Sequence, residues 1–545
     1  MSSVLDANGK EQTQAKDIAD VFATFFESLY DGDGKEFHNH GGYDNAIAVS
    51  PEEVRSQLKK MRGGKAADEN GVVAELLSKG SDLLMTTIAD VFTAVLNPQA
   101  TIPEYWKSSS IRVLFKKGDD RLPANYRPIC IIPILYKLFS RVLCGRIKDI
   151  LIAEQSYDQA GFRPGFSCDD HLFAITILAE KCNEFNVPLW IATLDFKKAF
   201  DSISHASIWE SLVAHGVPSI YVKTLSRLYS GQRAHVCCDV ASRAFNISRG
   251  TKQGDPISPF IFNSVLEEVM RKVKAKWTTK GYGRQLGYSD YTVLTNLRFA
   301  DDILLVGRSL PQIKRMIEDV QREGAKVGLE LHPEKTKIQH NNIGYGSKVR
   351  TAMVGSMQIE VMEPHTSNMY LGRALTLTNV HDAELSYRLK KAWAKFGAFK
   401  QELTDKSIPT NLRMKLFHSV VTPTALYGCG SWVMTAERDS RLKSTQFKMV
   451  RAILGRRRIV QPGGDIESWV EWVQRVTDEA RRMMEQFNIP GWIDERRSRL
   501  QRWNERLGNM SLERWARRAQ NWIPDGHRSR GRPPARWADQ LTLSP

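Results

Sequence analysis

The sequence lacks any hydrophobic run long enough to cross a membrane. Its longest apolar stretch, residues 129–136, is far shorter than the ~20 residues that a spanning helix requires. The first residues, MSSVLD, also lack the basic and apolar regions of a signal peptide. We find no basic amphipathic anchor either, so we expect no membrane partner.

Cysteines are few and scattered. The chain has seven, and an odd number without regular spacing is typical of free thiols in a reducing compartment. Only Cys429 lies beyond Cys238. The C-terminal half therefore cannot form a zinc module built on cysteines.

Acidic residues are outnumbered by basic ones. The 545-residue chain has 61 Asp and Glu against 77 Lys and Arg, a net charge of +16. Such an excess predicts a polyanionic partner such as nucleic acid. With 42% hydrophobic and 25% charged residues, the composition is typical of a globular protein with about three or four domains.

The first 104 residues predict helices and offer little chemistry of their own. Residues 17–30 have helical periodicity and a wide apolar face. Residues 51–61 predict a second helix, with Ser50 as its N-cap and Pro51 at its first position. We interpret residues 1–104 as a helical N-terminal extension.

The strongest chemical signal is a pair of adjacent carboxylates, Asp301 and Asp302, between two apolar runs. The pattern predicts a strand, a tight turn and a second strand, with both acids at the tip. Adjacent, partly buried carboxylates are unfavourable unless they are protonated or bind a cation. Taken alone, the stretch fits an ordinary turn equally well, because Asp favours turns.

A second predicted strand also ends in an acid. The apolar residues 190–194 lead into Asp195, and Phe200 and Asp201 follow. Asp195 lies 106 residues before Asp301, so the two acids can meet only in a sheet with a long crossover. We expect Asp201 to be structural, since two acids six residues apart cannot both be assumed to face one metal site.

Two loops carry further candidate residues. Cations that follow a predicted strand at 111–115 could hold a triphosphate, although a solvated charged turn would look the same. A glycine-rich loop at 249–259 precedes a helical pattern. The candidates that the residues themselves suggest are Lys116, Lys117 and Arg127, all in the first of these loops.

Seven sequence motifs occur in one order between residues 105 and 375. They are NYRPI (125–129), GFRPGFSCDDH (161–171), LDFKKAF (194–200), GTKQGDPISP (250–259), FADDILLV (299–306), HPEKT (332–336) and YLG (370–372). In this order they resemble the reverse transcriptases of non-LTR (LINE-type) retrotransposons. The closing segment GRPPARWAD (531–539) is similar to the C-terminal signature of RTE-like elements.

The resemblance implies an α+β fold of the right-hand polymerase type. Residues 105–375 would form the fingers and the palm with its antiparallel sheet, and residues 376–455 a helical thumb. Residues 456–545 would be a C-terminal region rich in arginine and tryptophan.

The C-terminal region has an unusual composition. It contains eighteen arginines, no lysine, twelve acidic residues and seven of the thirteen tryptophans. Arginine and tryptophan together can hold phosphates and stack on unpaired bases, so we expect nucleic-acid binding. A helical domain with a tryptophan core and arginine–glutamate surface pairs would have the same composition.

The activity that the resemblance implies is RNA-directed DNA synthesis. The enzyme would extend a DNA 3′ end on an RNA template, with dNTPs as substrates and two Mg²⁺ or Mn²⁺ ions as cofactors. Oxygen ligands suit Mg²⁺. The implied ligands are Asp195, Asp301, the carbonyl of Phe196 and, in a supporting role, Asp302.

The resemblance also implies roles for other residues. Phe200 would reject a ribose 2′-hydroxyl, and Gln253 with Gly254 would contact the incoming nucleotide and template. Lys335 would donate a proton to the leaving pyrophosphate. Phe200 could instead be a core residue, Gln253 could only shape its turn, and Lys335 could be a solvated lysine. The triphosphate would be held by Lys116 or Lys117 together with Arg127.

Other consequences concern the intact element. An endonuclease would be separate or missing, because the first hundred residues are too few for that fold. A nuclear location follows from the integration mode of such elements, in addition to the cytoplasm, and the oligomeric state stays open. The alternative function is a catalytically silent RNA-binding scaffold, against which the intact acids argue.

Overall fold

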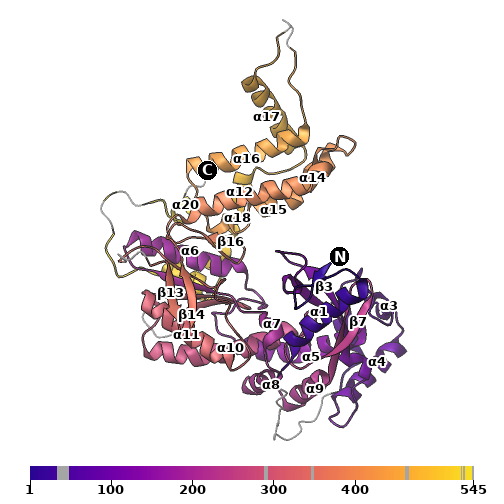
Figure 1. Cartoon of the computed structure of the whole chain (residues 1–545). Helices are drawn as coiled ribbons and strands as arrows, with labels where there is room; N and C mark the ends of the chain where they lie inside the picture. Colours follow the sequence, from indigo (N-terminus) through magenta and orange to yellow (C-terminus); the bar gives the residue numbers. More distant parts are fainter. Residues whose placement is uncertain are drawn as a thin grey trace. The chain divides into compact units, whose positions relative to one another are not determined.

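The computed structural model describes residues 1–32, 48–287, 292–344, 349–460, 465–528, 531 and 534–542. The chain forms two compact units, each built from separated stretches of sequence (Figure 1). The first unit comprises Met1–Pro164, Asp195–Thr279 and Met316–His332. The second unit comprises Gly165–Leu194, Lys280–Arg315 and Pro333–Pro545.

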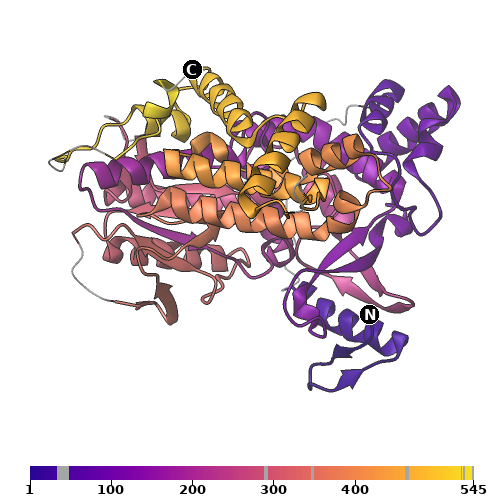
Figure 2. The same ribbon diagram turned by 90° about the horizontal axis from the view of Figure 1, so that it is seen from above.

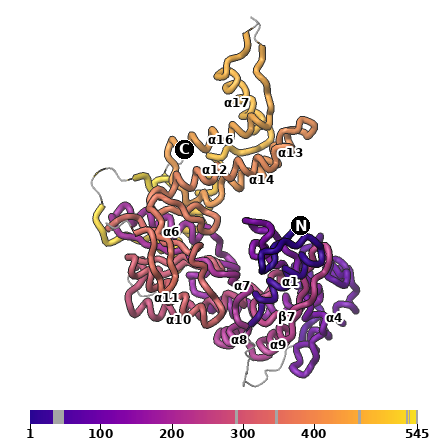
Figure 3. The backbone as a smooth tube through the Cα atoms, in the orientation of Figure 1, coloured from indigo at the N-terminus to yellow at the C-terminus, as the bar shows by residue number. Residues whose placement is uncertain are grey.

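The first unit is built on a four-stranded sheet of order β4-β3-β6-β7. β3 pairs antiparallel with β4 and parallel with β6, and β6 pairs antiparallel with β7. Helix α1 (Ala15–Tyr30) packs beside β7 (Figure 3) and buries the apolar face that its periodicity predicts. The strands are β3 (Ser108–Phe115), β4 (Tyr126–Ile131), β6 (Gln232–Cys237) and β7 (Ala241–Ile247).

Helices make up most of the rest of the first unit. The predicted second helix is α2 (Pro51–Lys59), and the Ser50 hydroxyl accepts a hydrogen bond from the Glu53 amide, 3.2 Å away, as an N-cap should. The other helices are α3 (Ala74–Ser78), α4 (Asp82–Leu96), α5 (Ile134–Ala153), α7 (Ala199–Ser202), α8 (His205–Ala214), α9 (Ser219–Tyr229) and α10 (Ser258–Thr279). A short hairpin, β1 (Val4–Leu5) and β2 (Glu11–Gln12), precedes α1.

The second unit contains a six-stranded sheet of order β10-β11-β5-β12-β14-β13. β5 lies inside it, antiparallel to both β11 and β12. The expected antiparallel sheet has one exception, since β14 runs parallel to β12 after the chain has reversed twice through β13. The strands are β5 (Trp190–Leu194), β10 (Asn296–Phe299), β11 (Asp302–Gly307), β12 (Lys337–His340), β13 (Thr351–Val354) and β14 (Met357–Val361).

The second unit also contains two smaller hairpins, and a long helix follows strand β11. The hairpins are β8 (Arg284–Gln285) with β9 (Val293–Leu294), and β15 (Asn368–Tyr370) with β16 (Arg373–Leu375). Helix α11 (Leu310–Ala325) follows β11 and continues from the second unit into the first.

Helices dominate the second half of the second unit. The predicted thumb region is helical, and its longest helices lie beside one another (Figure 2). These helices are α12 (Val380–Ala398), α13 (Lys400–Thr404), α14 (Thr410–Val420), α15 (Thr422–Ala425) and α16 (Ala436–Leu454). The C-terminal region adds α17 (Trp469–Gln486), α18 (Trp492–Gly508), α19 (Trp515–Asn521) and α20 (Asp539–Thr542). No helix in the described ranges is both long and apolar enough to cross a bilayer.

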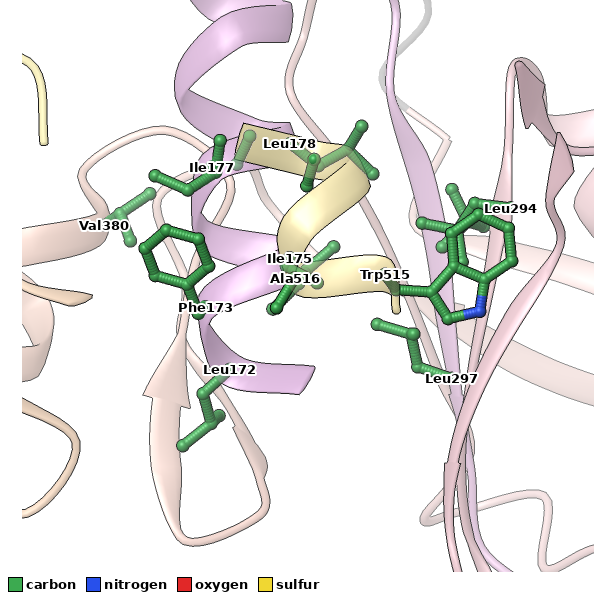
Figure 4. Close-up of a cluster of buried hydrophobic side chains, with 14 of the residues drawn as sticks. Leu172, Phe173, Ile175, Ile177, Leu178, Leu294, Leu297, Val380, Trp515 and Ala516 are labelled. Atoms are coloured by element: carbon green, nitrogen blue, oxygen red, sulfur yellow. The ribbon is translucent and has the colours of Figure 1, made fainter. Parts of the chain in front are cut away.

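The C-terminal tryptophans mostly belong to the hydrophobic core. Helix α6 (Cys168–Glu184) lies between the sheet and the C-terminal region, and α19 packs directly on it. Figure 4 shows Trp515 of α19 near Leu294 and Leu297 of the strands. Four of the seven tryptophans are at most 7% exposed, namely Trp492, Trp503, Trp515 and Trp537. The prediction from composition that tryptophans of this region stack on unpaired bases is therefore wrong for these four, because their rings are packed in the hydrophobic core.

Candidate active site

The ends of β5 and β11 lie side by side in the second unit's sheet, and an acid adjoins each end in the sequence. β5 and β11 pair antiparallel up to Leu194 opposite Ile303. Asp195 follows Leu194 directly in the chain, and Asp302 directly precedes Ile303. The long crossover that the sequence requires is present, since α7 to α10 and five strands separate β5 from β11 in the described chain.

The hairpin differs slightly from its predicted form. Asp302 pairs with Phe299 and is the first residue of β11, so Ala300 and Asp301 alone form the tip. Ala300 has a φ of +55°, a left-handed conformation that is uncommon for a residue with a side chain. Asp301 is half-buried, whereas Asp302 is exposed. The two acids therefore have different surroundings.

Left-handed backbone recurs in the sequence motifs. Apart from asparagine and glycine, the described residues with positive φ each lie in one of the seven motifs. Such conformations cost roughly 1–3 kcal/mol each and tend to collect at functional sites. These residues are Phe162, Lys198, Ala300 and Leu371.

The HPEKT motif begins beside Asp195. The His332 amide donates to the Asp195 carbonyl, 2.7 Å away, and the Lys197 amide donates to the Glu330 carbonyl at 2.8 Å. Phe196 lies between these bonds, opposite Leu331. Because successive residues of a strand bond to opposite sides, the Phe196 carbonyl points away from residues 330–332.

The oxygen atoms that Asp195 and the Phe196 carbonyl offer are of the type that binds a hard divalent cation. Carboxylates and a backbone carbonyl are oxygen ligands of the kind that Mg²⁺ prefers. In the described ranges, no group of three or more His, Cys, Asp or Glu side chains is arranged to hold a metal ion. A site made from these residues would therefore complete its coordination with the Phe196 carbonyl, water and substrate oxygens.

Phe200 contacts two other aromatic rings of the first unit. Its ring stacks on Phe262, with centroids 4.2 Å apart and an interplanar angle of 22°, and meets the edge of Phe162 at 6.5 Å. Phe262 comes from α10, and Phe162 from the GFRP loop. Phe200 stays half-buried, so its position fits both a core residue and a gate.

The predicted triphosphate-binding cations share one hairpin. Lys116 and Lys117 follow β3 directly, and Arg127 lies in β4 opposite Leu114; all three are exposed. The Lys116 amide donates to the Asn125 carbonyl at 2.9 Å, which closes the turn. Lys335 is exposed as well, three residues after His332.

The GTKQGDP loop contains charged residues whose burial the sequence does not signal. Lys252 is only 3% exposed, and its ammonium lies 4.2 Å from the centre of the Tyr136 ring. Burial lowers its pKa to about 8. The Tyr136 hydroxyl donates to the Asp255 carboxylate at 2.7 Å. Gln253, between these two charges, is half-buried and directs its side chain at Asp201.

Comparison with known proteins identifies the domain that contains these motifs. Residues 115–375 match the family model described as "Reverse transcriptase (RNA-dependent DNA polymerase)". All seven motifs lie inside this range. Residues 115–375 are a reverse transcriptase domain. The predicted right-hand polymerase fold is thereby confirmed.

The relatives of this reverse transcriptase domain come from non-LTR retrotransposons, as predicted. The chain is 28% identical over 47% of its length to the Pol polyprotein from type-2 retrotransposable element R2DM of Drosophila melanogaster. It is 29% identical over 47% to the Pol polyprotein from type-1 retrotransposable element R2 of Popillia japonica. The identity is 24% over 74% of the chain for the probable RNA-directed DNA polymerase from transposon X-element of D. melanogaster.

The chain is shorter than these relatives. It covers 24%, 34% and 44% of their respective lengths. Among solved structures, telomerase from Candida albicans aligns over 69% of this chain and 68% of its own, with 10% identity and a TM-score of 0.37.

Proposed function

We propose that this chain is an RNA-directed DNA polymerase that extends a DNA 3′-hydroxyl on an RNA template, with dNTPs as substrates. One observation carries the proposal: the pairing of Leu194 with Ile303, next to which Asp195 and Asp302 stand. Two neighbouring strand ends that both carry acids supply the oxygen ligands of a two-metal centre. The chain's excess of basic residues suits a nucleic-acid substrate.

The metal ligands would be Asp195, Asp301 and the Phe196 carbonyl, with Asp302 in support. When bound, two Mg²⁺ or Mn²⁺ ions would activate the 3′-hydroxyl and neutralise charge on the triphosphate. The half-buried position of Asp301 favours it over the exposed Asp302 as a ligand. Asp302 would then act mainly through its negative charge.

The remaining roles fall to residues around these acids. Lys116, Lys117 and Arg127 would hold the triphosphate from one hairpin, where Arg127 offers a planar fork to two oxygens. Lys335 would donate a proton to the leaving pyrophosphate. Phe200 would contact the sugar of the nucleotide, and Gln253 with Gly254 would contact the nucleotide and the template.

The wider biological setting also belongs to the proposal. We assign the fingers and palm to residues 105–375, the thumb to 376–455, the N-terminal extension to 1–104 and the C-terminal region to 456–545. The GRPPARWAD segment supports an RTE-like element, although its Arg532 and Pro533 lie outside the described residues. An endonuclease would be supplied by another region or protein, and integration would take place in the nucleus.

Primer extension on an RNA template tests this function. Asp195→Asn should lower the rate of dNTP incorporation about 100-fold or more, because a metal ion stabilises the transition state by several kcal/mol. RNA affinity, measured by filter binding, should stay unchanged. The matched control Asp239→Asn changes an exposed acid of the same unit and should keep full activity. A wild-type chain that binds RNA and incorporates no dNTP would instead support the silent scaffold.

A further inference from the structure

Asp201 is a buried carboxylate next to the proposed nucleotide-contacting residues. It lies on α7 directly after Phe200 and is only 1% exposed. Its surroundings offer three hydrogen bonds. The Tyr30 hydroxyl donates to Oδ1 at 3.0 Å, and Gln253 Nε2 lies 3.2 Å from Oδ1 and 3.1 Å from Oδ2. Burial outweighs these bonds and raises the pKa of Asp201 to about 6.

The carboxylate determines which end of the Gln253 amide faces outward. An ionised carboxylate can only accept hydrogen bonds, so only the NH₂ group of Gln253 can face Asp201. The amide oxygen of Gln253 must then point away from Asp201. Within the described part of the chain, no group donates a hydrogen bond to this oxygen. Gln253 therefore presents an acceptor, and not a donor, to whatever binds next to it.

Backbone contacts join the Gln253 loop to the turn that carries Phe200. The Thr251 amide donates to the Phe200 carbonyl at 2.7 Å, and the Gly250 amide donates to the Ile203 carbonyl at 2.7 Å. Gly250 has a φ of +82°, and a Cβ atom there would lie 2.6 Å from the Asp201 carbonyl oxygen. The loop can therefore approach α7 this closely only with glycine at this position.

Tyr30 brings the N-terminal helix into the same network. It is the last residue of α1 and is 2% exposed. Its carbonyl accepts from the amide and the hydroxyl of Ser248, at 3.0 and 2.9 Å, just before the Gln253 loop. Tyr30 thus contacts the loop through its backbone and Asp201 through its side chain.

We propose that Asp201 is a positioning residue that holds the Gln253 amide with its oxygen toward the nucleotide site, and that Tyr30 of α1 orients Asp201 for this task. The inference rests on the proposed polymerase function. It extends that function to a residue that does not touch substrate, and to a helix that lies outside the matched domain.

Steady-state incorporation of single dNTPs by the full chain tests the inference. Asp201→Asn lets the Gln253 amide adopt either orientation and should raise the KM for the matched dNTP about 10-fold, with a smaller change in kcat, since one hydrogen bond to a charged group is lost. Tyr30→Phe should shift KM in the same direction by a smaller factor. The control Tyr136→Phe removes a comparable buried bond, from Tyr136 to Asp255, and should lower thermal stability without this KM shift.

A double-mutant cycle separates positioning from a general loss of structure. If Asp201 acts through Gln253, adding Asp201→Asn to Gln253→Ala should raise KM no further. Independent effects that multiply, or an equal KM shift in Tyr136→Phe, would overturn the inference while leaving the polymerase function intact. A wild-type chain without dNTP incorporation would overturn both. If Asp201→Asn fails to fold, the cycle is carried out with Tyr30→Phe and Gln253→Ala. No further rise in KM in the double variant would support the inference, and effects that multiply would overturn it.

Discussion

Phe200 stacks on Phe262 and packs edge-on with Phe162, and these contacts restrict the motion of its ring. A ring held in this way can exclude a single hydroxyl group, because a site rejects a substrate with one extra group only when its side chains do not move aside. The hydrogen bond from the Thr251 amide to the Phe200 carbonyl fixes its backbone as well. At the scale of single residues, substrate choice is therefore the property to test.

Phe200→Ala should increase ribonucleotide incorporation relative to deoxyribonucleotide incorporation by about 10-fold or more, because the space next to the sugar opens. The measurement compares kcat/KM for one rNTP and the matching dNTP on the same RNA template. Phe200→Tyr keeps the ring and should keep the discrimination. An unchanged ratio in Phe200→Ala would assign Phe200 to the core alone.

At the scale of elements, α6 joins the sheet to the C-terminal region. The Trp537 amide donates to Glu180 Oε2 of α6 at 2.8 Å, and the Trp537 indole donates to the Gly430 carbonyl at 2.8 Å. The Trp537 ring meets the edge of Phe173, also on α6, at 4.7 Å. Burial raises the pKa of Glu180 from its ordinary 4.5 to about 7. The carboxyl group that anchors Trp537 is thus costly to ionise.

The raised pKa of Glu180 makes the folded protein less stable as the pH rises. Because the pKa of Glu180 is higher in the folded state than in the unfolded state, the folded protein is favoured while this carboxyl group is protonated. This contribution to stability is complete below about pH 4.5 and is lost as the pH rises through about 7. Glu180→Gln should therefore be more stable than wild type at pH 8, by up to about 3 kcal/mol, with a smaller difference at pH 5. Denaturant unfolding at the two pH values measures this. The exposed Glu505→Gln should show no such difference, and a Glu180→Gln chain that is less stable at pH 8 would contradict the account.

Local patterns predicted many elements, because their causes are local. Periodicity and capping residues located α1, α2 and α10, and alternation located the β10–β11 hairpin. The destination of the C-terminal tryptophans could not be predicted. Trp537 packs on Phe173, far earlier in the chain, and composition alone fits a core and a base-stacking surface equally. The hydrogen bond between Tyr30 and Asp201 could not be predicted for the same reason, because no local sequence pattern around either residue indicates the other as its partner.

At the scale of the whole molecule, the two units interleave along the sequence. The chain passes between them at Pro164, Leu194, Thr279, Arg315 and His332. The second unit draws its hydrophobic core both from the reverse transcriptase domain and from the C-terminal region. These parts are therefore expected to fold together.

Deletion of residues 456–545 should accordingly unfold the second unit. The deletion removes buried residues of α18 and α19 as well as Trp537, and large core truncations cost about 3–5 kcal/mol each. Circular dichroism and thermal melting of the shortened chain measure the effect. The exposed Trp469→Ala should lose little stability. A shortened chain that folds normally and only binds RNA less tightly would restore the nucleic-acid role for this region.

The proposed function assigns DNA synthesis on RNA to the acids at the ends of β5 and β11. Single-turnover incorporation of one dNTP, with saturating RNA template, DNA primer and Mg²⁺, tests it most directly. Asp301→Asn should reduce the rate of this chemical step about 100-fold or more, and Asp302→Asn should reduce it less. Template affinity should stay the same in both variants. Incorporation by Asp301→Asn at the wild-type rate would contradict the account.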